Sequence, residues 1–168
     1  MRYYIKNNMV SLTGSSYVLD EGGNKVFLVK GRFMSPTHKK MICDLQGNPL
    51  FSVRNKYWRL FHRFVYINDE RGGEHRRLCR VRSPFFGKWR IDDNAIGLSL
   101  EGIFMQGTHI YIDGRDVGMF YYDYNFTSVI FADSYTLEVY DESLLPFLVA
   151  LVVGYDNIRD QHERAVRD

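Results

Sequence analysis

The stretch that decides the fold is SLLPFLVALVVGY at residues 143–155, thirteen consecutive positions without a charged side chain. Two acids precede it, which suits the positive end of a helix dipole. Ser143 can cap the helix, and Pro146 then falls in the first turn, where a proline loses no backbone hydrogen bond. Because the segment is apolar on every side, the helix must be buried all round. We therefore expect a core helix over residues 143–158.

This helix is too short to cross a bilayer, because a spanning helix needs about 17–25 apolar residues. The segment therefore predicts a buried helix and no transmembrane span. Residues 156–168 are charged and predict a tail that extends the helix into solvent or frays. The side chains that we expect to be buried are Leu148, Val149, Leu151, Val152 and Tyr155.

The chain before this helix is patterned as short strands, with turn residues between β-branched and aromatic runs. Ile-Asp-Gly-Arg at residues 112–115 predicts a two-residue hairpin, because Asp-Gly tolerates the positive φ of a type I′ turn. One internal repeat, D-x-x-G-N-x-x-F-x-V, starts at Asp20 and again at Asp44. Both copies predict a turn that leads into a strand with Phe and Val inward, and with Lys30 and Arg54 outward. The spacing does not match an EF-hand loop, so these clusters predict turns and not calcium sites.

Strands followed by one wholly apolar helix have a specific physical solution. A sheet closed into a wide barrel has no free edges and can hold a helix inside. We therefore expect a single domain over residues 1–168, mainly β, with a closed antiparallel barrel of about twelve strands around the buried C-terminal helix.

Composition excludes several classes of protein. The chain has 22 Lys and Arg against 20 Asp and Glu, and a net charge of +2 argues against a basic nucleic-acid coat protein. Cys43 and Cys79 form no CxxC motif, so neither a disulfide framework nor a zinc site is indicated. The first residues lack the apolar core of a signal peptide, so we expect a cytoplasmic protein or one at the membrane periphery.

No pattern that carries catalysis is present in the sequence. A hydrolase elbow, a P-loop and a dinucleotide fingerprint are all missing. The histidines lack the spacing of metal ligands, which must converge three or four at a time. We expect no enzyme activity, no cofactor and no metal. The isolated histidines are His38, His62, His75, His109 and His162.

Four segments in order along the chain resemble the LURP-one-related family. They are YYIK at residues 3–6, the pair of Asp-x-x-Gly-Asn turns, DSYTLEV at residues 133–139 and LVALVV at residues 148–153. Such proteins are similar in fold to the C-terminal domain of tubby-like proteins and to phospholipid scramblases. The resemblance implies a closed barrel around a hydrophobic C-terminal helix. The lipid-binding motif of tubby relatives and the calcium segment and palmitoylated cysteines of scramblases have no match, so it implies a fold more than a function.

Charge is concentrated in residues 54–90, where eleven Lys or Arg and three acids give a local charge of +8. Basic and aromatic residues interleave over residues 56–64 and 82–90, which suits a membrane interface or single-stranded nucleic acid. Arg80 and Arg82 share strand parity, so both can point outward. The residues predicted to form one positive, anion-binding face are Arg54, Lys56, Trp58, Arg59, Arg63, Arg80, Arg82, Phe86, Lys88 and Arg90.

These features predict a binding or scaffolding module that docks weakly on anionic phospholipid or membrane surfaces. A protein–protein interaction module without lipid binding is the alternative, and an enzyme or a single-stranded nucleic-acid binder is less favoured. The basic segment also has a purely structural interpretation, in which aromatics cover the barrel ends and the charges are solvated.

Overall fold

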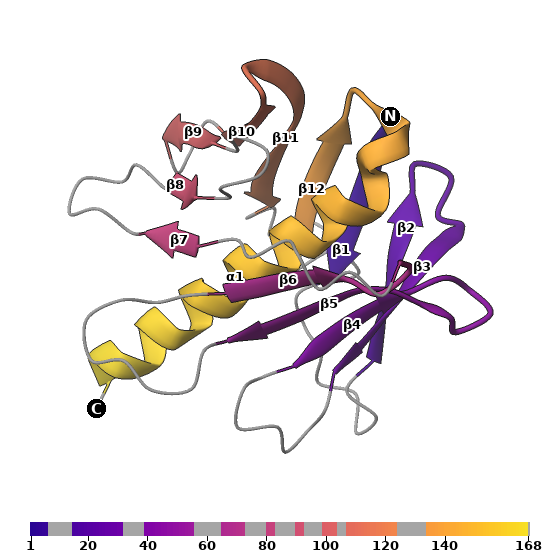
Figure 1. The fold of residues 1–168 in the computed structure, drawn as a ribbon, viewed down its shortest axis with the longest axis horizontal. Helices are drawn as coiled ribbons and strands as arrows, with labels where there is room; N and C mark the ends of the chain where they lie inside the picture. Colours follow the sequence, from indigo (N-terminus) through magenta and orange to yellow (C-terminus); the bar gives the residue numbers. More distant parts are fainter. Residues whose placement is uncertain are drawn as a thin grey trace.

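The computed structural model describes residues 1–6, 15–31, 39–55, 65–72, 80–82, 90–92, 99–103, 107–123 and 134–167. Of these, residues 6, 80–82, 90–92, 99–103, 123 and 158–167 are described by their backbone alone. The elements, shown in Figure 1, are β1 (Arg2–Lys6), β2 (Ser15–Asp20), β3 (Lys25–Gly31), β4 (Lys40–Cys43), β5 (Pro49–Asn55), β6 (Val65–Asp69), β7 (Arg80–Arg82), β8 (Arg90–Asp92), β9 (Ser99–Ile103), β10 (Gly107–Ile112), β11 (Arg115–Asp123), β12 (Ser134–Val139), the 3₁₀ turn η1 (Glu142–Leu144) and α1 (Leu145–Arg167).

The strands form one antiparallel sheet in the order β6-β5-β4-β3-β2-β1-β12-β11-β10-β9-β8-β7. The nine strands from β6 to β10 in this order form a continuous run, and the short strands β9, β8 and β7 extend it. The pairing of β1 with β12 joins the two halves of the chain, with Tyr4 opposite Thr136. The fold is thus mainly β with one C-terminal helix, as expected.

The expected closed barrel of about twelve strands is corrected by the structure to an open sheet that curves around the helix (Figure 1). β6 and β7 are the two ends of the pairing order, and the described residues contain no ladder between them. β7 and β8 have only three residues each. Strands of this length form few ladder hydrogen bonds, so they provide little edge for closure.

Tight turns connect the strands at one end of the sheet, which we call the turn end. In the two copies of the repeat, Asp20 and Asp44 each accept a 2.8 Å hydrogen bond from the backbone N–H of the asparagine four residues later. Hydrogen bonds from Asn24 and Asn48 lower the pKa of these two carboxyl groups. The repeat therefore forms turns, as the sequence predicts.

The Asp-Gly hairpin is also confirmed. Asp113 and Gly114 have φ angles of 50° and 76°, which are the two positive values that a type I′ turn requires. This hairpin joins β10 to β11 at the turn end. The opposite end of the sheet, which we call the loop end, contains Gly31, Lys40, Asn55 and Val65.

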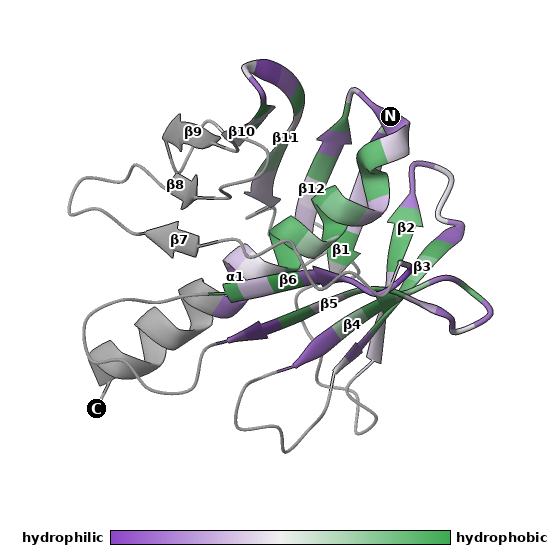
Figure 2. Ribbon diagram, in the orientation of Figure 1, coloured by the Kyte–Doolittle hydropathy of each residue, from purple (hydrophilic) through white to green (hydrophobic). Residues whose placement is uncertain are grey.

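The helix α1 starts at the turn end and runs along the concave side of the sheet toward the loop end (Figure 1). The buried apolar residues of α1 and of the strands form one core cluster, and Figure 2 shows hydrophobic stretches on both. All five side chains that the sequence predicts to be buried are at most 6% exposed: Leu148, Val149, Leu151, Val152 and Tyr155. A Cβ atom at Gly154 would lie 3.0 Å from Val65 Cγ1, so the missing side chain lets the helix approach β6 closely.

The start of the helix differs from the sequence prediction, whereas the charged end extends the helix, which is one of the two predicted alternatives. Asp141, not Ser143, is the cap: its carboxylate accepts hydrogen bonds from the backbone N–H and the hydroxyl of Ser143 at 3.1 and 2.6 Å. Pro146 lies in the first turn, as predicted. The helix continues to Arg167 because no Gly or Pro follows Gly154 to stop it. In the described part of the chain, no helix is both long enough and apolar enough to cross a membrane.

The position of Leu151 gives a direct test of the core. Replacing Leu151 with Asp places an unpaired charge inside the sheet, which costs more than a small domain can sustain, so we expect the protein not to fold. Leu45 is 51% exposed, so Leu45→Asp is the matched control and should unfold like the wild type. Urea denaturation followed by circular dichroism measures both. A soluble, cooperatively unfolding Leu151→Asp protein would contradict this core.

Candidate functional site

The predicted positive face is only partly covered by the structure. Arg54 is described with its side chain, and Arg80, Arg82 and Arg90 are described by their backbone. The remaining predicted residues lie outside the described residues: Lys56, Trp58, Arg59, Arg63, Phe86 and Lys88. The face as a whole therefore stays a prediction.

Arg54 lies on the outer side of the sheet near the loop end and is exposed. Its guanidinium carbon is 5.3 Å from the ring centroid of Tyr66, the residue opposite it on β6. This is the distance of a cation–π contact at an exposed site. Lys30, the equivalent of Arg54 in the internal repeat, is exposed on β3. The outward position that the repeat predicts for both residues is confirmed.

A third cation lies between these two strands. Lys39 directly precedes β4, and the next residue, Lys40, pairs with Val53 of β5. Lys39 is therefore beside Arg54 along the edge of the loop end. We call Lys30, Lys39 and Arg54 the outer basic stripe. It extends the predicted face by two residues that the sequence did not assign to it.

The other basic positions are on the far side of the pairing order. Arg82 is opposite Arg90 in the β7–β8 ladder, and Arg80 is opposite Asp92. β5 is second in the sheet order and β7 is last, so strand pairing does not bring Arg54 to these arginines.

A cluster that the sequence did not reveal lies inside the sheet at the loop end. Lys40 Nζ is 3.4 Å from Asp156 Oδ2, and the hydroxyl of Tyr135 donates to Asp156 Oδ1 at 3.1 Å. The side chains of Lys40 and Asp156 are only 14% and 5% exposed. With Asn55, which is 4% exposed on β5, these residues form what we call the polar collar.

The collar corrects the expectation that the charged tail begins in solvent at residue 156. Asp156 and Asn157 are 4% and 3% exposed, so the helix is still inside the sheet where it becomes polar. Strand parity could have predicted that Lys40 faces inward, because Lys40 lies two residues before the fully buried Ile42. Its contact with Asp156 spans 116 residues of sequence, and no local pattern encodes it.

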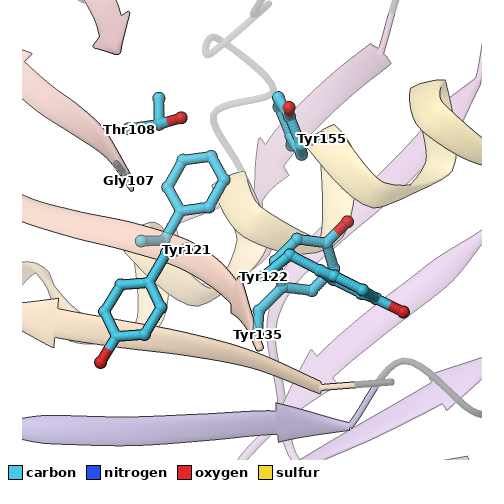
Figure 3. Close-up of a pocket in the computed structure, with 7 residues that line it drawn as sticks. Gly107, Thr108, Tyr121, Tyr122, Tyr135 and Tyr155 are labelled. Atoms are coloured by element: carbon cyan, nitrogen blue, oxygen red, sulfur yellow. The ribbon is translucent and has the colours of Figure 1, made fainter. Parts of the chain in front are cut away.

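A small pocket adjoins the collar through Tyr135. Its walls are residues of β10, β11, β12 and α1: Gly107, Thr108, Phe120, Tyr121, Tyr122, Tyr135 and Tyr155. Figure 3 shows the ring of Tyr121 turned away from those of Tyr122 and Tyr135. Phe120 and Tyr155 pack edge to face at 4.9 Å, as do Tyr122 and Tyr135 at 5.2 Å. Aromatic rings packed in this way fill most of the space between them.

Groups capable of acid–base or metal chemistry do not gather at this pocket. His109 Nδ1 is 2.8 Å from Asp116 Oδ2, and both side chains are partly exposed on the outer side of β10 and β11. Burial raises the pKa of the Cys43 thiol, which makes it a poor nucleophile. Among the residues that the structure describes, no group of His, Cys, Asp or Glu could hold a metal ion.

The buried pair in the collar has a measurable energetic signature. Lys40→Met leaves the Asp156 carboxylate without its cation, and we expect a loss of about 3–5 kcal/mol in the free energy of unfolding. Lys40→Met/Asp156→Asn removes both charges and keeps an acceptor for Tyr135, so most of the stability should return. Urea denaturation measures both variants. A Lys40→Met protein as stable as the wild type would rule out the pair.

Comparison with known proteins shows which family the chain is similar to. No curated protein and no solved structure matches the chain significantly. The sequence profile of the LURP-one-related family matches residues 1–156, which include every described strand and the buried part of α1. The chain therefore belongs to the LURP-one-related family.

Proposed function

We propose that this protein is a non-enzymatic binding module that docks weakly on anionic phospholipid surfaces with its loop end. The observation that carries the proposal is the outer basic stripe, where Lys30, Lys39 and Arg54 lie on neighbouring strands at one edge of the sheet. Exposed cations near an anionic membrane contribute about 1 kcal/mol each. Arg54 is exposed at this edge, Lys39 is half-buried, and the ammonium group of Lys30 lies beside Gly47 in the turn between β4 and β5, so the docking is weak and depends on salt.

The sequence between β5 and β6 adds to this charge. β5 ends at Asn55 and β6 begins at Val65, and both of these residues lie at the loop end. The intervening sequence, KYWRLFHRF at residues 56–64, lies outside the described residues and is rich in cations and aromatic residues. Amphipathic aromatic and basic side chains are the residue types that partition to a membrane interface.

Charge at the turn end has the opposite sign. Among the described residues there, acids outnumber bases, and the acidic ones are Asp20, Glu21, Asp44, Asp69, Glu70, Asp113, Asp116, Glu138, Asp141 and Glu142. A molecule with cations at one end and acids at the other is oriented by an anionic surface, with the basic end toward it. This polarity supports docking through the loop end.

A protein partner is the second candidate. Leu45 and Tyr140 are 51% and 54% exposed, and both follow strands at the turn end. Large apolar side chains at such positions suit contact with another protein, although single exposed ones are common. This candidate places the contact at the end of the sheet opposite the outer basic stripe. The two proposals therefore predict that substitutions at different ends of the sheet reduce binding.

Co-sedimentation with liposomes tests the docking proposal. We expect the wild type to pellet with phosphatidylserine or phosphoinositide vesicles at low salt, less at physiological salt, and not with neutral vesicles. Lys30→Glu/Arg54→Glu should lose most of this binding. Lys25→Glu/Arg115→Glu makes the same charge change at the turn end and should retain it. Circular dichroism confirms that both variants are folded.

Two outcomes of this experiment contradict the proposal. No binding to any anionic vesicle at low salt ends the membrane hypothesis and favours the protein partner. Equal losses in the two charge variants show that net charge, and not the outer basic stripe, controls binding. Single-stranded RNA and DNA are measured alongside, and binding to them without vesicle binding moves the function to nucleic acid.

A further inference from the structure

The amide of Asn55 is buried without a hydrogen-bond partner. The side chain is 4% exposed, and neither its nitrogen nor its oxygen is bonded to any residue that the structure describes. A buried polar group without a partner costs about 1–3 kcal/mol. Native proteins contain few such groups, and each requires an explanation. An amide kept at this cost indicates that something other than the described chain satisfies it.

The neighbours of Asn55 have unused donors of their own. Lys40 pairs with Val53, so Asn55 is the diagonal neighbour of Lys40 on the inner side, about 7–8 Å away between Cα atoms. Within the described chain, Asp156 is the one hydrogen-bond partner of Lys40, and their contact of 3.4 Å is long for an ion pair. An ammonium group has three protons to donate, so two remain.

The strand on the other side of Lys40 places no side chain opposite it. Gly31 is the residue of β3 opposite Lys40, and it has no side chain to fill the inner side at this level. The unsatisfied donors of Lys40 and Asn55 therefore belong to two neighbouring strands, β4 and β5, at the loop end of the interior.

The balance of these groups identifies the chemistry of the missing partner. The unsatisfied donors are two protons of Lys40 and two of Asn55, against one acceptor on Asn55. Donors predominate and one of them is cationic, which suits the oxygens of an anion. We propose that the polar collar binds a small oxyanion, a carboxylate or phosphate group, between Lys40 and Asn55.

Asp156 sets the strength of this site. Its carboxylate neutralises part of the Lys40 charge and is itself held by the hydroxyl of Tyr135. The anion therefore meets a donor-rich site with little net charge, and it binds weakly. The oxyanion can be free in solution or part of a lipid headgroup. The site does not depend on the proposed membrane docking, because none of its residues belongs to the outer basic stripe.

Thermal unfolding in sodium phosphate, compared with sodium chloride at equal ionic strength, tests the site. Phosphate stabilises proteins in general, so the informative quantity is the difference between variants in the phosphate-induced shift of Tm. Asn55→Leu removes the unsatisfied amide and keeps its shape, so its Tm in chloride should equal or exceed that of the wild type. Its additional phosphate shift should disappear. Gln46→Leu, the same change at an exposed position of the turn end, should keep the wild-type shift.

A second variant distinguishes the loss of the anion site from a folding defect. Lys40→Met/Asp156→Asn removes the cation without leaving a buried charge, and it should lose the phosphate shift in the same way. Isothermal titration calorimetry with phosphate and with acetate then measures binding directly. We expect the affinity of Asn55→Leu to be at least about tenfold weaker than that of the wild type, a difference of 1.4 kcal/mol or more.

The outcomes distinguish a free anion from a lipid headgroup, and some of them would contradict the proposal. If Asn55→Leu loses the phosphate response but still pellets with anionic vesicles, the site takes a free anion. If it loses both, the site takes a headgroup. Equal phosphate shifts in all variants, or no calorimetric binding to the wild type, show that ordered water satisfies Asn55 and contradict an oxyanion site.

Discussion

The burial of the apolar part of α1 against the concave side of the sheet is the interaction on which the rest of the structure depends. Leu148, Leu151 and Val153 are at most 4% exposed and point to different sides of the helix, so strands must surround it on most of its circumference. Each such side chain gains about 1.5–3 kcal/mol from burial. Without the helix, the inner side chains of the strands, such as Ile42 and Phe51, would face water.

The same packing determines where the chemistry of the interior can lie. Near the turn end the buried side chains of the helix are apolar and the strands opposite it supply mainly Val, Ile, Leu and Phe, and the hydroxyl of Tyr3 donates to Glu142 at the start of the helix. At Asp156 the helix becomes polar while it is still buried, and Lys40 and Tyr135 of the strands bind its carboxylate. The polar collar and the outer basic stripe therefore share the loop end of the sheet, on its inner and outer sides.

Local patterns predicted the local structure well. The Asp-x-x-Gly-Asn repeat and the Asp-Gly pair specify turns through their own side chains and through positive φ at Gly23 and Gly114, so they need no distant partner. The uncharged run likewise requires burial wherever it is placed. Lys30 and Arg54 were placed outward correctly because strand parity follows directly from the buried Val29 and Val53.

Features that depend on distant parts of the chain were not predictable in this way. Closure depends on whether β6 and β7 pair, and neither strand encodes its partner. Asp141 replaced Ser143 as the cap because a 3₁₀ turn precedes the α-helix, which composition does not specify. In the sequence, Lys40 resembles an ordinary surface lysine. Its position inside the sheet is stable because its ammonium group pairs with Asp156, which lies near the other end of the chain.

Native-state hydrogen exchange tests most directly whether the helix and the sheet form one cooperative core. The account predicts that the backbone amides of Leu148, Leu151 and Val152 exchange only through global unfolding. Their free energy of exchange should then equal that of Val53 and Leu137 in the strands and the value from urea denaturation. Exchange of the helix amides at a free energy lower by more than about 1.4 kcal/mol, a tenfold faster opening, would show that the helix leaves the sheet on its own and would contradict the account.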